Sequence, residues 1–345
     1  MTQTIFRLKK MKNDYIIKRI TNLEISDFQN LIKKHWVKRN HIFSKKKDVV
    51  NFYYNFRNNK NTNILGLYKK NKLCSVMGLI PSKNWDSKLK RDYFIAFLLK
   101  SKSVNDSTFN FLNYIYKKIN PNFLAVSGIN METSGKIFER LGEIKFFSHY
   151  YILNPQIKSK LTKNLKYSKL KNFNDNLKLL ISNKIIKMPF SKFKPKKSKN
   201  YFENKYLKNP YYNYYIMNFF NSNKLVFFFV FRQIQIKKLK RKILRVIDYQ
   251  GDIPKKASII KPISKYLIEN NIEYLDMMCH GFPKKSLENI GFLLKKKNQK
   301  IPDHFEPFTG RNAELNFSIM INKYKRNIIL LKGDGDQDRP NLPRN

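Results

Sequence analysis

The chain contains one pattern twice, first as Phe123-Leu124-Ala125-Val126-Ser127-Gly128 followed by Lys136-Ile137-Phe138-Glu139-Arg140-Leu141-Gly142, and later as Tyr274-Leu275-Asp276-Met277-Met278-Cys279-His280-Gly281 followed by Ser286-Leu287-Glu288-Asn289-Ile290-Gly291-Phe292. Each copy predicts an apolar strand that ends at Gly and a helix that stops at a second Gly. The stop glycines Gly142 and Gly291 lie 149 residues apart. A duplication of that size predicts two similar domains. We expect the functional site where they meet, because small-molecule sites form preferentially at domain junctions.

The composition fits a folded protein with an unusually high positive charge. A length of 345 residues with 42% hydrophobic content suits two domains, at roughly 150 residues each. The 70 Lys and Arg against 24 Asp and Glu give a net charge of +46, which is typical of proteins that bind nucleic acid or anionic membranes. However, the basic residues are mostly Lys, are spread over every segment, and accompany many Asn, Ile, Phe and Tyr. All of these have A/T-rich codons, so genome composition explains the bias and nucleic acid is the less favoured partner.

The cysteines and the apolar runs exclude several other classes. Cys74 and Cys279 have no CxxC spacing and no His at zinc-ligand intervals, so we expect neither a disulfide framework nor a metal. The longest apolar run, 225–231, is far shorter than the roughly 20 residues of a membrane span. We therefore expect a cytoplasmic protein without a membrane span. The same run predicts a strand that is buried on both faces.

The order of predicted elements is β-α-α-β-β-β-α-β-α-β over the first half. The strands are 15–20, 63–68, 73–81, 91–99, 123–127 and 146–153, and the helices are 24–35, 48–56, 107–119 and 133–141. A connector follows, with helical content over 177–186 and an exposed linker over 187–200. The second half repeats the scheme with a hairpin over 214–233, a strand over 243–249, a helix over 257–269 and strands over 274–279 and 317–322. We place the domains at 1–155 and 201–345, with 156–200 as a linker between them.

This order resembles the GNAT acyltransferase fold. The runs Ile129-Asn130-Met131 and Ile137-Phe138-Glu139-Arg140-Leu141-Gly142 resemble a motif of that family. Four further strings look like those of tandem-GNAT proteins encoded among bacterial surface-polysaccharide genes: 206–212, 245–251, 304–308 and 332–341. The expected fold class is therefore α/β with mixed sheets, arranged as two GNAT-like domains in tandem.

The resemblance implies an acyl-CoA co-substrate, with acetyl-CoA as the simplest, and no metal. The acceptor it implies is an amino or hydroxyl group of a sugar, nucleotide-linked, in surface-glycan synthesis. In the family, the helix amino terminus after the fourth strand binds the pyrophosphate, since unpaired N–H groups and the helix dipole favour anions there. Here the usual glycine loop is absent from both halves. The candidate donor-binding residues are Lys100, Ser101, Lys102, Ser103 and Asn130, although an ordinary basic loop explains the 100–106 string equally well.

The second half supplies the candidate acceptor residues. In its loop, Asp252 would repel phosphate, which suggests a changed role for that domain. Three residues are candidates for the general base: Asp248, His280 and Glu306. Each also has an ordinary interpretation, respectively a turn or cap residue, a local hydrogen-bonding histidine and a loop salt bridge. Tyr274 and Asp276 are candidate substrate-binding residues, although Asp276 and Glu273 equally fit solvent-facing strand positions.

A final acidic string carries a sharper local signal. Asp334, Asp336 and Asp338 alternate as the first ligands of a calcium loop do, but Arg339 stands where that loop needs Gly. We therefore expect internal partners for Lys or Arg, or a lid over a cationic amino sugar. Arg339 before Pro340 is a candidate donor to a carboxylate or phosphate. A disordered acidic end is the alternative.

Two other functions stay open at this point. One is a FemAB-like peptidyl transferase, which pairs GNAT domains and takes its acyl group from aminoacyl-tRNA. The other is a non-catalytic module that binds RNA or another polyanion, which the loss of both glycine loops favours. The sequence leaves the oligomeric state open.

Overall fold

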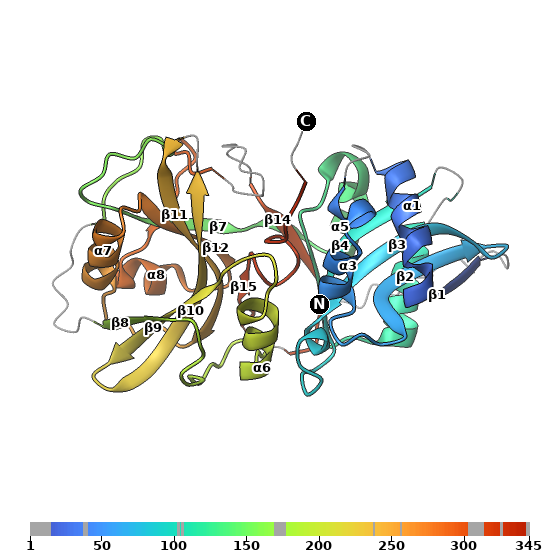
Figure 1. Cartoon of the computed structure of the whole chain (residues 1–345), viewed down its shortest axis with the longest axis horizontal. Coiled ribbons are helices and arrows are strands. Elements are labelled where there is room, and N and C mark those ends of the chain that lie inside the picture. Colours follow the sequence, from blue (N-terminus) through green and yellow to red (C-terminus); the bar gives the residue numbers. More distant parts are fainter. Residues whose placement is uncertain are drawn as a thin grey trace. The chain divides into compact units, whose positions relative to one another are not determined.

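Two units make up the protein, which is described by a computed structural model of residues 15–36, 41–101, 104, 107–168, 177–236, 239–255, 257–302, 314–324 and 327–342. The first unit comprises Met1–Val126 with Met320–Lys323, and the second comprises Ser127–Ile319 with Tyr324–Asn345. Within the described ranges, the strands form two mixed sheets accompanied by helices (Figure 1). The mixed α/β class expected from the sequence is confirmed.

The first sheet has the strand order β1-β2-β3-β4-β5-β14-β6. Its strands are β1 (Tyr15–Thr21), β2 (Asn61–Lys69), β3 (Lys72–Pro81), β4 (Asp92–Lys100), β5 (Phe123–Ser127), β6 (Ile144–Phe146) and β14 (Asn316–Asn322). The first four run antiparallel, and β4 and β5 run parallel. The accompanying helical elements are η1 (Asn22–Glu24), α1 (Ile25–His35), α2 (Ile42–Lys45), α3 (Lys47–Tyr54), η2 (Ser82–Asn84), α4 (Ser107–Tyr114), η3 (Ile115–Ile119), η4 (Met131–Gly135) and α5 (Lys136–Leu141).

Local sequence explains two of these elements directly. Helix α1 buries Ile25, Phe28 and Ile32, whose spacing places them on one face of a 3.6-residue helix. The hairpin between β2 and β3 turns at Lys70 and Asn71, which both have positive φ (47° and 61°). A two-residue turn with that backbone matches the right-handed twist of the strands, so the predicted hairpin is confirmed.

The second sheet has the strand order β13-β7-β12-β11-β10-β9-β8, with β15 beside β12. Its strands are β7 (Ser148–Leu153), β8 (Lys178–Ser182), β9 (Tyr215–Asn221), β10 (Lys224–Ile236), β11 (Arg241–Gly251), β12 (Tyr274–His280), β13 (Leu293–Leu294) and β15 (Leu330–Leu331). The helical elements are α6 (Lys199–Phe202), η5 (Glu203–Leu207), α7 (Ile260–Glu269) and α8 (Lys284–Ile290). Strands β11 and β12 are parallel and are connected through α7. Phe227, Phe228 and Phe229 of β10 are fully buried, as their apolar run predicts.

Several sequence-based assignments need correction. Strand β7, expected to close the first sheet, instead lies between β12 and β13 of the second sheet. Its residues 149–153 are buried, so side chains on both faces of the strand are covered. The 177–186 segment forms strand β8 instead of a helix, because Leu179 and Ile181 alternate toward the core. The expected strand over 317–322 is β14 of the first sheet.

The 187–200 linker is less exposed than expected. Lys194 is buried, and its backbone N–H donates to the carbonyl of Asn327 at 3.3 Å. The side-chain amine of Lys197 is buried as well. The division of the chain at Val126 also differs from the expected boundary at residue 155, since β7 and β8 both belong to the second sheet.

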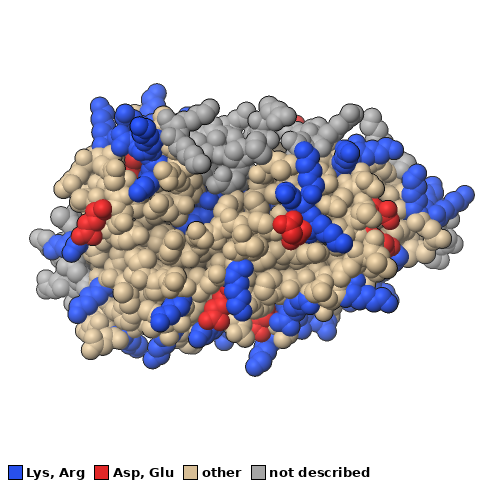
Figure 2. Space-filling view, viewed as in Figure 1, with Lys and Arg blue, Asp and Glu red and all other residues tan. Residues whose placement is uncertain are grey.

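Surface charge, helix hydrophobicity and possible metal ligands do not point to one class of ligand. On the face drawn in Figure 2, Lys and Arg side chains are scattered and do not gather in one stripe. Within the described ranges, no helix is long and apolar enough to cross a membrane. The same ranges hold no group of three or more His, Cys, Asp or Glu side chains arranged for a metal ion.

Candidate functional site

Each unit contains one parallel strand pair that separates after a β-bulge. In β4, Ala96 has no partner in β3, because Ile95 pairs with Leu79 and Phe97 pairs with Gly78. In β11, Ile247 is likewise skipped, because Val246 pairs with Phe231 and Asp248 pairs with Val230. A bulge bends its strand and sharpens the local twist. The two bulges therefore mark equivalent places in the two units.

Beyond its bulge, β4 leaves one edge unpaired. Its last pair with β5 is Ile95 with Val126, and from Phe97 to Lys100 it pairs with β3 alone. Ala96 and Leu98 are partly exposed there. We call residues 96–100 the β4 edge. Among the described residues, no second strand pairs with this edge. An unpaired strand edge can bind the amides of a molecule, as an added strand does.

The residues expected to bind a donor lie at the carboxyl end of β4. Lys100 is exposed and Ser101 is buried, with the Ser101 N–H donating to the carbonyl of Cys74 at 2.9 Å. Lys102 and Ser103 lie outside the described residues. Asn130 belongs to the second unit, where its side chain accepts the N–H of Glu132 at 3.0 Å and caps η4. Capping accounts for Asn130 without a ligand.

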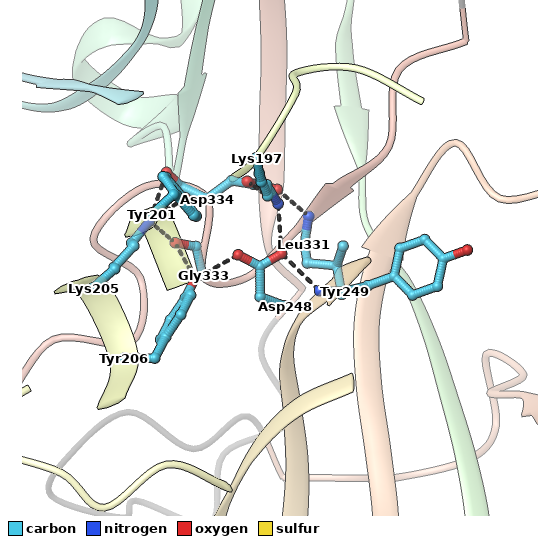
Figure 3. A network of polar contacts seen from close by, with 9 residues as sticks. All are labelled: Lys197, Tyr201, Lys205, Tyr206, Asp248, Tyr249, Leu331, Gly333 and Asp334. Carbon is cyan, nitrogen blue, oxygen red and sulfur yellow. Dashed lines mark hydrogen bonds and ion pairs between the residues drawn. The ribbon is translucent and has the colours of Figure 1, made fainter. Parts of the chain in front are cut away.

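At the equivalent place in the second unit, Asp248 is the centre of a buried polar network (Figure 3). One carboxylate oxygen lies 2.5 Å from the Lys197 amine and 2.7 Å from the Tyr249 N–H that donates to it. Its other oxygen accepts the Tyr206 hydroxyl at 2.7 Å. Burial alone would lower the pKa of Lys197, but Asp248 and Asp334 raise it above its ordinary value. Both carboxylate oxygens of Asp248 thus have partners, and the side chain is not positioned as a free general base.

A second lysine joins this network. The Lys205 amine donates to the carbonyl of Gly333 at 2.5 Å and to the Tyr201 hydroxyl at 2.9 Å. Burial lowers the pKa of Lys205 to about 8. Burial likewise raises the pKa of the Tyr201 and Tyr206 hydroxyls well above the ordinary value, so both act as neutral hydrogen-bonding groups.

The three aspartates of the acidic string all have internal cationic partners. Asp334 lies 2.6 Å from the Lys197 amine, and Asp336 accepts from Arg339 at 2.8 Å. Asp338 accepts from Arg232 at 2.9 Å. The internal partners expected from the sequence are therefore present, and Arg339 already binds a carboxylate of its own segment. Asp334, Asp336 and Asp338 are buried, which excludes the disordered end.

Asp276 and Tyr274 lie in the core of the second unit. Asp276 has no exposed surface and accepts from Arg245 at 2.9 and 2.6 Å, while His149 lies 2.8 Å away. Burial would raise the pKa of Asp276, but Arg245 overrides it and holds that pKa well below its usual range. Tyr274 is fully buried too. Neither side chain presents a surface to a substrate, and the solvent-facing alternative for Asp276 and Glu273 is wrong.

His280 is the candidate base that keeps some access to solvent. It is half-buried at the end of β12, and its ring centroid lies 4.6 Å from that of Phe317. Burial, and then the nearby Lys145, lower the pKa of His280 below its ordinary value. The imidazole is therefore neutral near pH 7 and able to accept a proton. Glu306 lies outside the described residues.

Two of the pockets that described residues line lie in the second unit. One, of about 380 Å³, lies beside α6; its lining includes Met188, Phe190, Phe193, Lys196, Lys197 and Lys199. The other, of about 460 Å³, is mostly aromatic; its lining includes Tyr211, Tyr212, Tyr215, Phe231, Arg232 and Tyr266. The first pocket lies at the carboxyl end of β11, where Gln250 also lines it.

Comparisons with known proteins identify distant structural likenesses alone. No family model matches the chain, and no curated protein matches it. Among solved structures, it is similar to a GCN5-related N-acetyltransferase from Anabaena variabilis, at 9% identity and a TM-score of 0.48 over 88% of this chain and 72% of that one. It is also similar to a GCN5-related N-acetyltransferase from Kribbella flavida, at 8% identity and a TM-score of 0.47 over 88% of this chain and 70% of that one. A third similar structure is the N-myristoyltransferase of Saccharomyces cerevisiae with bound myristoyl-CoA, at 13% identity and a TM-score of 0.41 over 96% of this chain and 85% of that one.

Proposed function

We propose that the protein is an acyl-CoA-dependent transferase that acylates an amino or hydroxyl group of a nucleotide-linked sugar, in surface-glycan synthesis. The β4 edge is the observation that carries this proposal. Within the part of the chain that the structure describes, β4 has a strand partner on one side alone from Phe97 to Lys100, next to the bulge at Ala96. The amide groups of a pantetheine arm have the shape and hydrogen bonding of an extended peptide, so they suit such an edge.

The end of β4 also suits the charged part of the donor. Lys100 is exposed there, and α4 begins a few residues later at Ser107. Unpaired N–H groups at a helix amino terminus attract anions, and a lysine adds a positive charge. A pyrophosphate bound near Lys100 would place the rest of the donor along the β4 edge.

The transfer itself needs few side chains. The acceptor nitrogen or oxygen attacks the thioester carbonyl carbon, a new N–C or O–C bond forms, and the C–S bond breaks. The acceptor's proton passes to a base, for which we propose His280, because its imidazole is neutral and partly accessible. The departing thiolate takes its proton from water. Holding the two reactants together supplies much of the acceleration, at effective molarities of about 10⁵ M or more.

The pocket beside α6 supports the acceptor class. Lys196 and Lys199 are exposed at its wall, and lysine is a common binder of phosphate. Met188 and Phe193 supply apolar surface next to these charges. A nucleotide combines phosphate with apolar surface, so we assign the nucleotide part of the sugar substrate to this pocket.

A charge-reversal pair tests the donor site. Isothermal titration with acetyl-CoA should show binding to the full chain, and Lys100→Glu should raise Kd about tenfold, a loss of about 1.4 kcal/mol. The matched control is Lys83→Glu, an exposed lysine in η2 at the opposite end of the same sheet, which should leave Kd unchanged. Release of free thiol in the presence of nucleotide-linked amino sugars then measures transfer. Absence of acetyl-CoA binding, with RNA co-purifying in a steeply salt-dependent manner, would favour the tRNA-dependent or polyanion-binding alternatives.

A further inference from the structure

In the second unit, the place equivalent to the β4 edge is occupied by the chain itself. Leu331 and Leu330 pair with Cys279 and His280 at the end of β12. The Gly333 N–H then donates to the carbonyl of the bulge residue Ile247 at 3.0 Å. The 330–338 segment therefore links the two strands where they separate, as a bound arm would do along β4.

Packing around the segment leaves no room for a second occupant. Ile247 and Tyr249 are buried, whereas Ala96 and Leu98, the corresponding residues of the first unit, are partly exposed. A Cβ atom added at Gly333 would lie 2.5 Å from the Tyr206 hydroxyl oxygen and 2.6 Å from a methyl carbon of Ile247. The segment fits closely enough that glycine is required at this position.

Charged contacts fix the segment at both ends. Near its start, Asp334 lies 2.6 Å from the Lys197 amine and accepts the Leu331 N–H at 2.7 Å. Near its end, Asp338 accepts from Arg232 and from the Tyr214 hydroxyl, the latter at 2.7 Å. Displacing the segment would leave the buried Arg232 without Asp338 and would remove one of the two carboxylates beside Lys197, which is strongly unfavourable.

We propose that the 330–338 segment is a permanent occupant of the second unit's strand separation, so that the chain binds one acyl donor, at the β4 edge of the first unit. The donor part of this inference rests on the proposed function. The occupancy part does not, because it follows from the segment's own contacts. The second unit thereby keeps the acyl-transfer fold but has lost the donor site that the fold would offer.

Hydrogen exchange on the ligand-free full chain tests the occupancy. Amides of 333 and 334 should exchange as slowly as those of β12, with no change when acetyl-CoA is added. Gly333→Val should speed exchange across the segment at least tenfold, because its Cβ has no room. Gly135→Ala is the matched control: its nearest neighbour is the flexible Met131 side chain, so exchange in the segment should not change. Rapid exchange in the unaltered protein, or release of the segment by acetyl-CoA, overturns the inference.

Binding stoichiometry tests the exclusion of a second donor. Titration with acetyl-CoA should give one site per chain, weakened about tenfold by Lys100→Glu. Lys255→Glu, the matched reversal in the loop after β11, should change nothing, since Lys255 is equally exposed. Two sites per chain, or a loss caused by Lys255→Glu instead, contradicts the inference and leaves the proposed function standing. A protected segment with no acetyl-CoA binding refutes the proposed function and upholds the occupancy.

Discussion

Replacing Asp276 with Asn should destabilise the second unit severely, because it leaves a buried guanidinium without its counter-ion. Arg245 has no exposed surface, and its bonds to Asp276 at 2.9 and 2.6 Å are joined by one to the carbonyl of Pro302 at 3.1 Å. Breaking a buried pair by removing one partner costs about 3–5 kcal/mol. At roughly 3 °C per kcal/mol for a unit of this size, Tm should fall by about 10 °C.

Circular dichroism melts and urea titrations of the full chain measure this loss. The matched control is Glu269→Gln, which breaks an exposed 3.7 Å pair with Lys265 in the same unit and should cost under about 0.5 kcal/mol. A double variant, Arg245→Met with Asp276→Leu, should be more stable than Asp276→Asn, since neither charge of this pair is then present. A cost below about 1 kcal/mol for Asp276→Asn, or a double variant that is worse than the single one, would refute the reasoning.

The same pair makes stability depend on pH with a definite sign. Because the folded pKa of Asp276 lies below its unfolded value of about 3.9, its contribution is complete above that unfolded value. The contribution is lost as pH falls toward the folded pKa. Acid should therefore destabilise the unaltered protein more steeply than Asp276→Asn, and parallel stability curves between pH 5 and pH 2 would contradict this expectation.

Three further outcomes follow from single residues. Gly281→Ala should destabilise the protein by about 3 kcal/mol in urea titrations, because φ at Gly281 is +92° and an added Cβ would lie 1.7 Å from a backbone oxygen. The control Gly135→Ala should change stability by less than about 1 kcal/mol. Equal effects of the two substitutions would count against this expectation. If His280 is the base, kcat/KM should fall as pH is lowered, with an apparent pKa below 6.5, because the protonated ring cannot accept a proton. His280→Gln should abolish this fall on the acid side. If the fall is unchanged in the variant, His280 is not the base. Cys74 and Cys279 are both buried, so iodoacetamide should label neither thiol before urea is added, and rapid labelling of the folded protein would contradict their burial.

Local patterns anticipated much of the fold but few of its long-range pairings. The duplicated strand–helix–glycine pattern, the Lys70-Asn71 turn and the buried Phe run are properties of neighbouring residues, and the structure confirms them. The local pattern of β7 predicts the wrong sheet, because pairing with β12 depends on contacts more than a hundred residues away.

The candidate site shows the same limit. An apolar strand ending in Asp248 indicates that some partner exists, and three alternating aspartates indicate cationic partners. Nothing local connects residues 197, 248 and 334, so the sequence pattern does not indicate that Lys197 and Lys205 belong to the site. The i, i+4 spacing of Tyr201 and Lys205 was the one available signal, and it is common in ordinary helices.

The position of β14 has a consequence for biosynthesis. It stands next to β5 in the strand order of the first sheet, yet it begins at Asn316. On the ribosome, at about 5–20 residues per second, roughly 10–40 s pass between the synthesis of β5 and that of β14. During that time the nascent sheet has an uncovered β5 edge, which is the kind of edge that recruits strands from other chains. Chaperone supply during translation should therefore influence the yield of this protein.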